Sequence, residues 1–219
     1  MNKLKLSLLL LLISFSALSA QSKYHLGVNG VYVSSTGDLA DLFDKGIGGL
    51  ASLSYDVSDR IQLSVTTGYL KLSFNNDYIN SQLKEAGLNT TVDIDASMSI
   101  IPLMVGGKYF LSSSDFRPYV AADLGLHISK ITSEKITVGG LQFDAVASAS
   151  ETKAAFDFGI GFLYKIAPKV NLDVNGKINF NGTEIKKEKS FSSGGVTTTE
   201  TSESSASFFT ISAGILFEL

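Results

Sequence analysis

The residues of this sequence best suited to catalysis are its two histidines, His25 and His127, and the serine that follows the second one. His127 and Ser129 are two positions apart, so on a β-strand their side chains point to the same side. A serine acts as a nucleophile when a base lies within hydrogen-bond reach and a third group orients that base. Glu134 or Glu151 could supply the acid of such a set. We keep His127 and Ser129 as weak candidates, and expect His25 to be buried and hydrogen-bonded instead.

The sequence gives little indication of other catalytic or ligand-binding sites. No phosphate-binding loop, catalytic carboxylate pair or histidine cluster stands out, so we expect no cofactor and no metal. The chain has no cysteine, and an exported domain without disulfides must be held by its backbone hydrogen bonds and side-chain packing. No run of about 18 apolar residues follows the leader, so membrane insertion by a helix is not expected.

The first twenty residues have the pattern of a secretory signal peptide. Lys3 and Lys5 precede segment 6–20, which begins with an apolar run and ends in small residues suited to cleavage. We therefore expect a cleaved leader over 1–20 and one folded domain over 21–219. The leader takes two of the 18 lysines and arginines, which leaves a net charge of about −5 against 21 acids. Because no basic block remains, we expect no nucleic-acid partner.

Eight segments alternate between apolar and polar residues, which is typical of β-strands. The clearest is the last, where Phe209, Ile211, Ile215 and Phe217 share one face. The connections between the segments are alternately long and short, and the long ones include an expected helical turn and an expected helix. This pattern predicts an all-β, eight-stranded antiparallel up-and-down transmembrane barrel with both termini in the periplasm. The expected strands are 24–33, 46–56, 61–69, 99–111, 117–129, 154–165, 170–180 and 207–219, and the expected helical segments are 41–44 and 77–88.

The two faces of these strands differ in composition. One is apolar, with tyrosines near both ends as in an interfacial girdle. The other is mostly Gly, Ser, Asn, Thr and Ala with few charges, whereas a soluble surface is about a quarter to a third charged. A soluble barrel of the lipocalin type, a ligand carrier, is the alternative, but the small polar face fits a narrow lumen better. Its charges must pair there, and the expected lumen polar network is Lys108, Asp123, Asp157, Lys165, Asp173, Lys177 and Glu218.

Two Gly-Gly pairs predict hairpins that extend past the membrane. With Gly194-Gly195 as a turn, Phe180 faces Phe209 and Val170 faces Leu219, and the apolar faces of the two strands match. A turn at Gly139-Gly140 instead pairs even with odd positions although both apolar faces are even. A bulge or a three-residue turn must therefore absorb one residue in that hairpin.

Several segments resemble the small outer-membrane barrel family that includes OmpX and the OmpA transmembrane domain. They are TGDLADLFDKGIGG, IPLMVGGKYF and RPYVAADLGL, and the final SFFTISAGILFEL resembles the signal read by the barrel-assembly machinery. The chain departs from the family in ending on Leu219, where Phe is usual. The resemblance implies an integral outer-membrane protein of a Gram-negative-type envelope, in contact with outer-membrane lipid and assembled by that machinery as a monomer.

The expected role is structural or a surface interaction, by which an extracellular protein partner binds the loops. Eight strands leave room only for their own side chains, so no pore is expected. Hairpins beyond the membrane leave strand edges free for a partner strand. The alternative is a lipid-modifying enzyme, because His127 and Ser129 resemble the His-x-Ser of outer-membrane lipid A deacylases. Lys130 stands where that motif has Asn, and we expect no enzyme.

Overall fold

The structure is a computed structural model that describes residues 23–193 and 196–219; the expected signal peptide at 1–20 lies outside this part. No helix in the described part is long and apolar enough to cross a membrane. Most of the described residues lie in β-strands. In chain order the elements are β1 (Tyr24–Thr36), α2 (Asp38–Leu42), β2 (Phe43–Ser58), β3 (Ile61–Phe74), α3 (Asn76–Glu85), β4 (Val92–Phe110), β5 (Phe116–Val138), β6 (Leu141–Ala167), β7 (Val170–Ser193) and β8 (Val196–Glu218).

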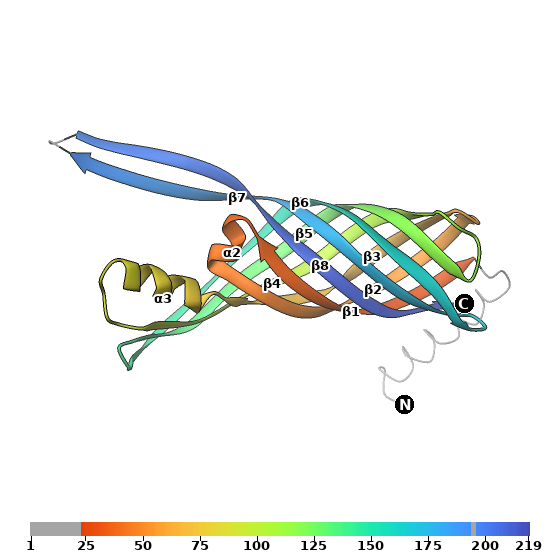
Figure 1. Cartoon of the computed structure of the whole chain (residues 1–219), viewed down its shortest axis with the longest axis horizontal. Coiled ribbons are helices and arrows are strands. Elements are labelled where there is room, and N and C mark those ends of the chain that lie inside the picture. Colours follow the sequence, from red (N-terminus) through yellow and green to blue (C-terminus); the bar gives the residue numbers. More distant parts are fainter. Residues whose placement is uncertain (1–22, 194–195) are drawn as a thin grey trace, which may run out of the picture.

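The strands form one closed barrel in which each strand pairs with its neighbours in sequence. β1 and β8 close the ring in antiparallel pairing, from His25 opposite Glu218 to Thr36 opposite Ser207. This confirms the predicted up-and-down architecture. β1 begins and β8 ends at the end of the barrel that has the short turns (Figure 1). The helices and the long strand extensions lie at the opposite end.

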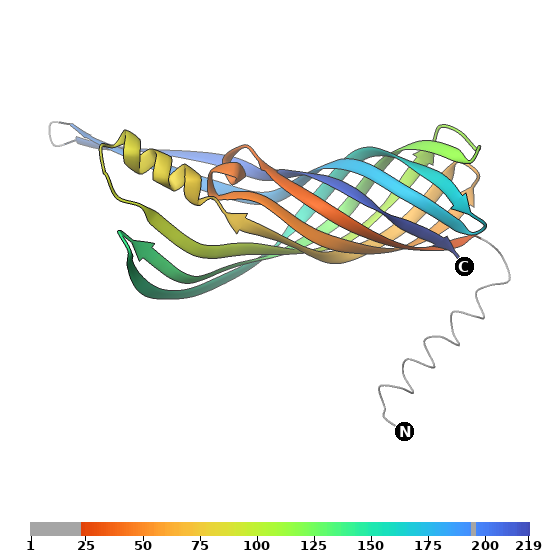
Figure 2. The ribbon, with the colours of Figure 1, turned by 60° about the horizontal axis from the view of Figure 1, so that its bottom comes forward.

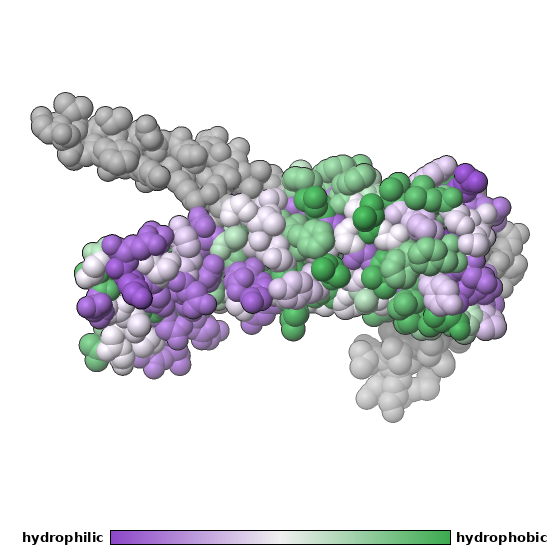
Figure 3. All heavy atoms as spheres, viewed as in Figure 1, coloured by the Kyte–Doolittle hydropathy of each residue, from purple (hydrophilic) through white to green (hydrophobic). Residues whose placement is uncertain are grey.

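The outer wall of the barrel is apolar. Ile47, Leu124 and Ile160 point outward and are 72%, 67% and 65% exposed. Hydrophobic residues gather over the barrel, whereas hydrophilic residues cover the α3 end (Figure 3). A ligand carrier of the lipocalin type would instead enclose such side chains, so the structure does not favour that alternative. An apolar outer belt is what a membrane barrel presents to lipid.

The lumen is packed rather than open. An apolar cluster near the helices includes Val33, Leu72 and Phe208, and a second one near the short turns includes Phe110 and Leu216. The space between them that can receive water amounts to about 60 Å³. An eight-stranded barrel is just wide enough for its own side chains. The interior is therefore a core with a polar middle layer.

The hairpin predicted at Gly139-Gly140 is present. Val138 pairs with Leu141, and the two glycines between them have φ angles of 56° and 86°, as a two-residue hairpin turn requires. The pairing shifts by one residue between Ser133 and Lys135 of β5. The predicted bulge therefore absorbs the parity mismatch, and the turn keeps two residues.

In the β7–β8 hairpin, the observed strand register differs from the predicted one within the barrel. Ser193 pairs with Val196, as the predicted turn requires; Gly194 and Gly195 themselves lie outside the described residues. Between Phe180 and Glu184 the register shifts, so that in the barrel Phe180 pairs with Ser207 and Val170 with Phe217. The predicted pairs Phe180–Phe209 and Val170–Leu219 are wrong by two residues. Because the shift is even, each residue keeps its predicted face.

Both predicted helical segments exist, with moved boundaries. α2 begins at Asp38 and ends at Leu42, so the predicted turn at 41–44 lies only partly within it. α3 covers Asn76–Glu85, so it begins one residue before the predicted segment 77–88 and ends three residues before its end. The Asn75 side chain accepts a hydrogen bond from the Tyr78 backbone N–H at 3.1 Å, which caps the start of α3. The cap explains why this helix begins at 76.

Candidate functional site

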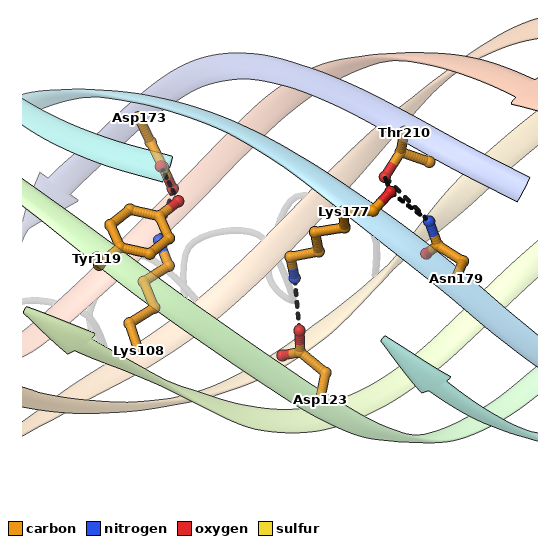
Figure 4. Close-up of polar contacts among 7 residues, drawn as sticks. All are labelled: Lys108, Tyr119, Asp123, Asp173, Lys177, Asn179 and Thr210. Atoms are coloured by element: carbon orange, nitrogen blue, oxygen red, sulfur yellow. Dashed lines mark hydrogen bonds and ion pairs between the residues drawn. The ribbon is translucent and has the colours of Figure 1, made fainter. Parts of the chain in front are cut away.

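Two ion pairs cross the lumen. Lys108 on β4 donates from Nζ to Asp173 Oδ2 on β7 at 2.6 Å, and Lys177 on β7 donates to Asp123 Oδ2 on β5 at 2.6 Å (Figure 4). β7 is adjacent to neither β4 nor β5 in the sheet. The side chains therefore reach across the barrel interior. Both carboxylates are buried, and a buried charge is tolerated when it is paired in this way.

Neutral polar groups complete this polar layer. Tyr119 donates its hydroxyl to Asp173 Oδ1 at 2.6 Å, and Lys108 Nζ lies 4.6 Å from the centre of the Tyr119 ring. Asn179 donates to Thr210 Oγ1 at 3.1 Å. These contacts hold Asp173 from two sides and join β7 to β8. The layer links the strands to one another, with both apolar clusters packed beyond it.

The structure brings together most, but not all, of the predicted lumen network. Asp157 on β6 is buried directly beside Asp123, its pairing partner on β5. Lys165 is exposed near the short-turn end, and Glu218 is half-buried in the last residues of β8. Neither takes part in an ion pair within the described residues. Tyr119 was missed, although its odd position on the predicted strand 117–129 placed it on the lumen face.

The two candidate catalytic residues face the lumen. His127 and Ser129 are 1% and 7% exposed. The His127 ring lies 5.6 Å from that of Phe208, centre to centre. Within the described part, no hydrogen bond joins the two side chains, and Nδ1 of His127 has no partner to orient it. The geometry lacks both the nucleophile–base contact and the orienting group that a serine mechanism requires.

His25 has the buried, hydrogen-bonded role expected for it. Its Nε2 lies 2.8 Å from Asp56 Oδ2 near the short-turn end, and the side chain is almost fully covered. Gln62 donates to the other oxygen of the same carboxylate at 2.8 Å. The three residues tie β1, β2 and β3 together at this rim. No group of His, Cys, Asp and Glu side chains among the described residues is arranged to hold a metal.

At the opposite end, β4, β5 and β6 continue past the barrel and stay paired with one another, apart from the β7–β8 hairpin. We call residues 92–96 of β4, 133–138 of β5 and 141–147 of β6 the extension (Figure 2). Its pairing places two rows of apolar residues on one face of the sheet, since paired residues and residues two apart share a face. Much of this face is open: Leu141 is 68% exposed and Phe143 55%. The rows are Val92–Val138–Leu141 and Ile94–Ile136–Phe143.

α3 covers the β4 edge of the extension. Asn76 donates to the Ile94 carbonyl at 3.2 Å and accepts from its N–H at 2.8 Å. Asn80 makes the same two bonds with Val92, at 2.9 and 2.8 Å. The two amides thus take the place of a neighbouring strand. Sequence reasoning missed this role; the signal was a pair of asparagines one helical turn apart, just before a strand.

Comparisons with known proteins agree with this architecture. Residues 6–217 match the model of a family described as outer membrane protein beta-barrel domain. Outer membrane protein PagN of Salmonella typhimurium is 28% identical over 153 residues, which are 65% of this chain and 62% of PagN. The match therefore spans less than two thirds of that relative.

Two solved structures share the fold at low identity. Neisserial surface protein A has a TM-score of 0.54 and 16% identity, with 90% of this chain and 97% of that chain covered. A major outer membrane protein of Thermus thermophilus has a TM-score of 0.51 and 10% identity, with 89% and 98% covered. At these identities the likeness concerns the barrel alone.

Proposed function

Because this chain belongs to the outer membrane protein beta-barrel domain family, we propose that it binds a partner at the cell surface through the extension. The chain is an integral outer-membrane β-barrel whose apolar wall contacts lipid. In outer-membrane barrels the short turns lie in the periplasm and the long connections outside. On that rule both termini are periplasmic, and α3 and the extension stand on the outer side of the membrane.

The observation that carries the proposal is the exposed apolar face of the extension. Leu141 and Phe143 are exposed near the Gly139-Gly140 turn of the extension. The end of the molecule that carries α3 has a largely hydrophilic surface (Figure 3). Contiguous apolar surface with a polar rim marks an interaction site. An aromatic and a branched aliphatic side chain on a rigid sheet can insert into a pocket of a partner protein with little loss of conformational entropy.

The barrel itself favours no competing role. Apolar clusters occupy both ends of the lumen, which argues against passage of solutes. His127 and Ser129 lack the contacts of a catalytic pair, and they face the lumen rather than lipid. We therefore propose no enzymatic activity. We further propose a monomeric protein whose β8 strand is read by the barrel-assembly machinery, which the alternating apolar pattern up to Phe217 supports.

The test compares adhesion of a non-adherent Gram-negative strain that displays the chain with that of the same strain displaying variants. Replacing Leu141 and Phe143 together by serine should reduce attachment to cultured epithelial cells at least fivefold. Leu88→Ser removes a similarly exposed apolar residue outside the extension and should leave attachment unchanged. Heat-modifiable migration on a detergent gel verifies that each variant folds. Equal attachment by the double variant and the parent would contradict the proposal.

A further inference from the structure

One carboxylate of the polar layer lacks a partner of its own. Asp157 on β6 is 5% exposed, and its Oδ1 makes no hydrogen bond to any described residue. Its cross-strand neighbour Asp123 accepts a hydrogen bond from Lys177 Nζ at 2.6 Å, so that lysine is already engaged (Figure 4). A buried charge is tolerated where a counter-charge or hydrogen bonds replace water. Asp157 therefore requires a positive group that the other described side chains do not supply.

The charged side chains around the lumen cavity do not balance. Among the described residues, its lining includes three aspartates and two lysines: Asp123, Asp157, Asp173, Lys108 and Lys177. Each lysine is bound to one aspartate at 2.6 Å, so one negative charge remains. His127 also lines the cavity, but its ring packs against Phe208 and its Nδ1 contacts no described hydrogen-bonding group. The unbalanced charge is that of Asp157.

The rest of the lining offers the oxygen atoms that hard cations prefer. Buried serines line the cavity from three strands, Ser54 on β2, Ser64 on β3 and Ser212 on β8. Asn29 on β1 adds its side-chain amide. Carboxylate, hydroxyl and carbonyl oxygens bind alkali and alkaline-earth ions better than soft metals. Because a single carboxylate is free and the other oxygens are neutral, the set matches one positive charge rather than two.

The cavity has the size of a small ion with a few water molecules. The space in it that can receive water is about 60 Å³, and one water molecule needs ~10–15 Å³ of such space. Na⁺ or K⁺ with a few waters fits this volume, whereas a bulky organic cation does not. The two apolar clusters close the cavity on both sides. An ion is therefore enclosed while the barrel folds.

We propose that the lumen cavity binds one alkali cation, Na⁺ or K⁺, at the Asp157 carboxylate, with hydroxyl oxygens and water completing its coordination. The cation balances the third aspartate and leaves both lysine–aspartate pairs intact. A ligand that binds the folded chain and not the unfolded one stabilises the fold. The site thus makes the stability of the barrel depend on the cation present. This inference concerns the lumen and is independent of the proposed surface-binding function.

The first experiment refolds the full mature chain into detergent micelles in NaCl, KCl or N-methyl-D-glucamine chloride at neutral pH. Equal salt concentrations keep electrostatic screening the same, and the glucamine cation is too large for the cavity. The urea concentration at half-unfolding should be higher by about 0.5 M or more in NaCl or KCl. Equal midpoints in the three salts would overturn the inference.

Two variants on β6 locate the site. Asp157→Asn keeps the shape of the side chain and removes its charge, so its urea midpoint should be the same in all three salts. Asp144→Asn changes an exposed aspartate of the same strand and should keep the salt dependence of the parent. A salt dependence that persists in Asp157→Asn would place the cation elsewhere and overturn the assignment.

Direct observation of the ion needs no variant. Crystals of the parent chain refolded in RbCl, whose cation replaces K⁺ and scatters anomalously, should show an anomalous peak in contact with the Asp157 carboxylate. A lumen without such a peak would overturn the inference. A urea midpoint that is the same in all three salts but changes with pH would assign the balancing charge to a proton, and the cation site would fall.

Discussion

Asn80 on α3 and Val92 on β4 are joined by two hydrogen bonds, at 2.9 and 2.8 Å, in which the side-chain amide both donates and accepts. A primary amide carries the same donor and acceptor as a peptide group. Four helical residues rise about 6 Å and two strand residues about 6.8 Å. Asn76 therefore meets Ile94 while Asn80 meets Val92. A helix can cover a strand edge because these two spacings nearly coincide.

Replacing Asn80 by alanine should open this edge without unfolding the barrel. Each lost hydrogen bond costs about 1 kcal/mol, and the Val92 N–H loses its acceptor. We expect faster amide exchange at Val92, measured by hydrogen exchange, with unchanged heat-modifiable migration. Gln82→Ala, on the exposed side of the same helix, is the control. Unchanged exchange at Val92 would show that the amide does not protect the edge.

Replacing Lys108 by methionine should destabilise the barrel strongly. Asp173 is buried and would lose its cation while keeping only the Tyr119 hydroxyl. Removing one partner of a buried ion pair typically costs about 3–5 kcal/mol. Urea unfolding in detergent micelles measures the change.

Two further variants test the cause. Adding Asp173→Asn to Lys108→Met should recover part of the lost stability, because it removes the uncompensated charge. Lys165→Met, at an exposed position, should be nearly neutral. Equal effects of Lys108→Met and Lys165→Met would refute a stabilising role for the pair.

Gly106 and Gly30 should respond differently to alanine. A Cβ at Gly106 would collide with the Asp123 carboxylate and the Ala122 carbonyl, whereas one at Gly30 meets the Ala213 carbonyl only at 3.8 Å. Overpacking typically costs about 1–3 kcal/mol. Gly106→Ala should lower the unfolding free energy by about this amount through displacement of Asp123 from Lys177, and Gly30→Ala should change it little. The same unfolding titration compares them, and a stable Gly106→Ala variant would contradict the packing argument.

Ser129→Ala should leave membrane lipid unchanged. The Ser129 hydroxyl is enclosed in the lumen, and within the described chain it makes no hydrogen bond to His127. Mass spectrometry of lipid A from cells that display the parent or the variant measures the acyl-chain pattern. A deacylated species present with the parent and absent with Ser129→Ala would establish the enzymatic alternative.

Local patterns account for the predictions that the structure confirms. Alternation along each strand assigns residues to the two faces, because successive side chains point to opposite sides. Together with the composition of the two faces, it placed His127, Asp123 and Asp173 in the lumen, where they lie. The Gly139-Gly140 pair predicted a hairpin in which a bulge or a three-residue turn absorbs one residue, since both the turn residues and the parity of the two apolar faces can be read from the sequence.

Contacts between distant segments could not be predicted in this way. The two-residue shift between Phe180 and Glu184 leaves every face unchanged, so no alternation pattern signals it. The partners Lys108 and Asp173 lie on strands that are not neighbours, and the stagger of the closed ring decides which charges meet.

The sequence by itself determined an eight-stranded membrane barrel with its apolar face outward, because period, composition and turn residues act over short distances. Only the tertiary structure decided which edge of the extension is open. That depends on where β7 separates from β6 at Ala155 and on where α3 brings Asn76 and Asn80 against β4. Both are contacts between segments that local patterns in the sequence do not specify.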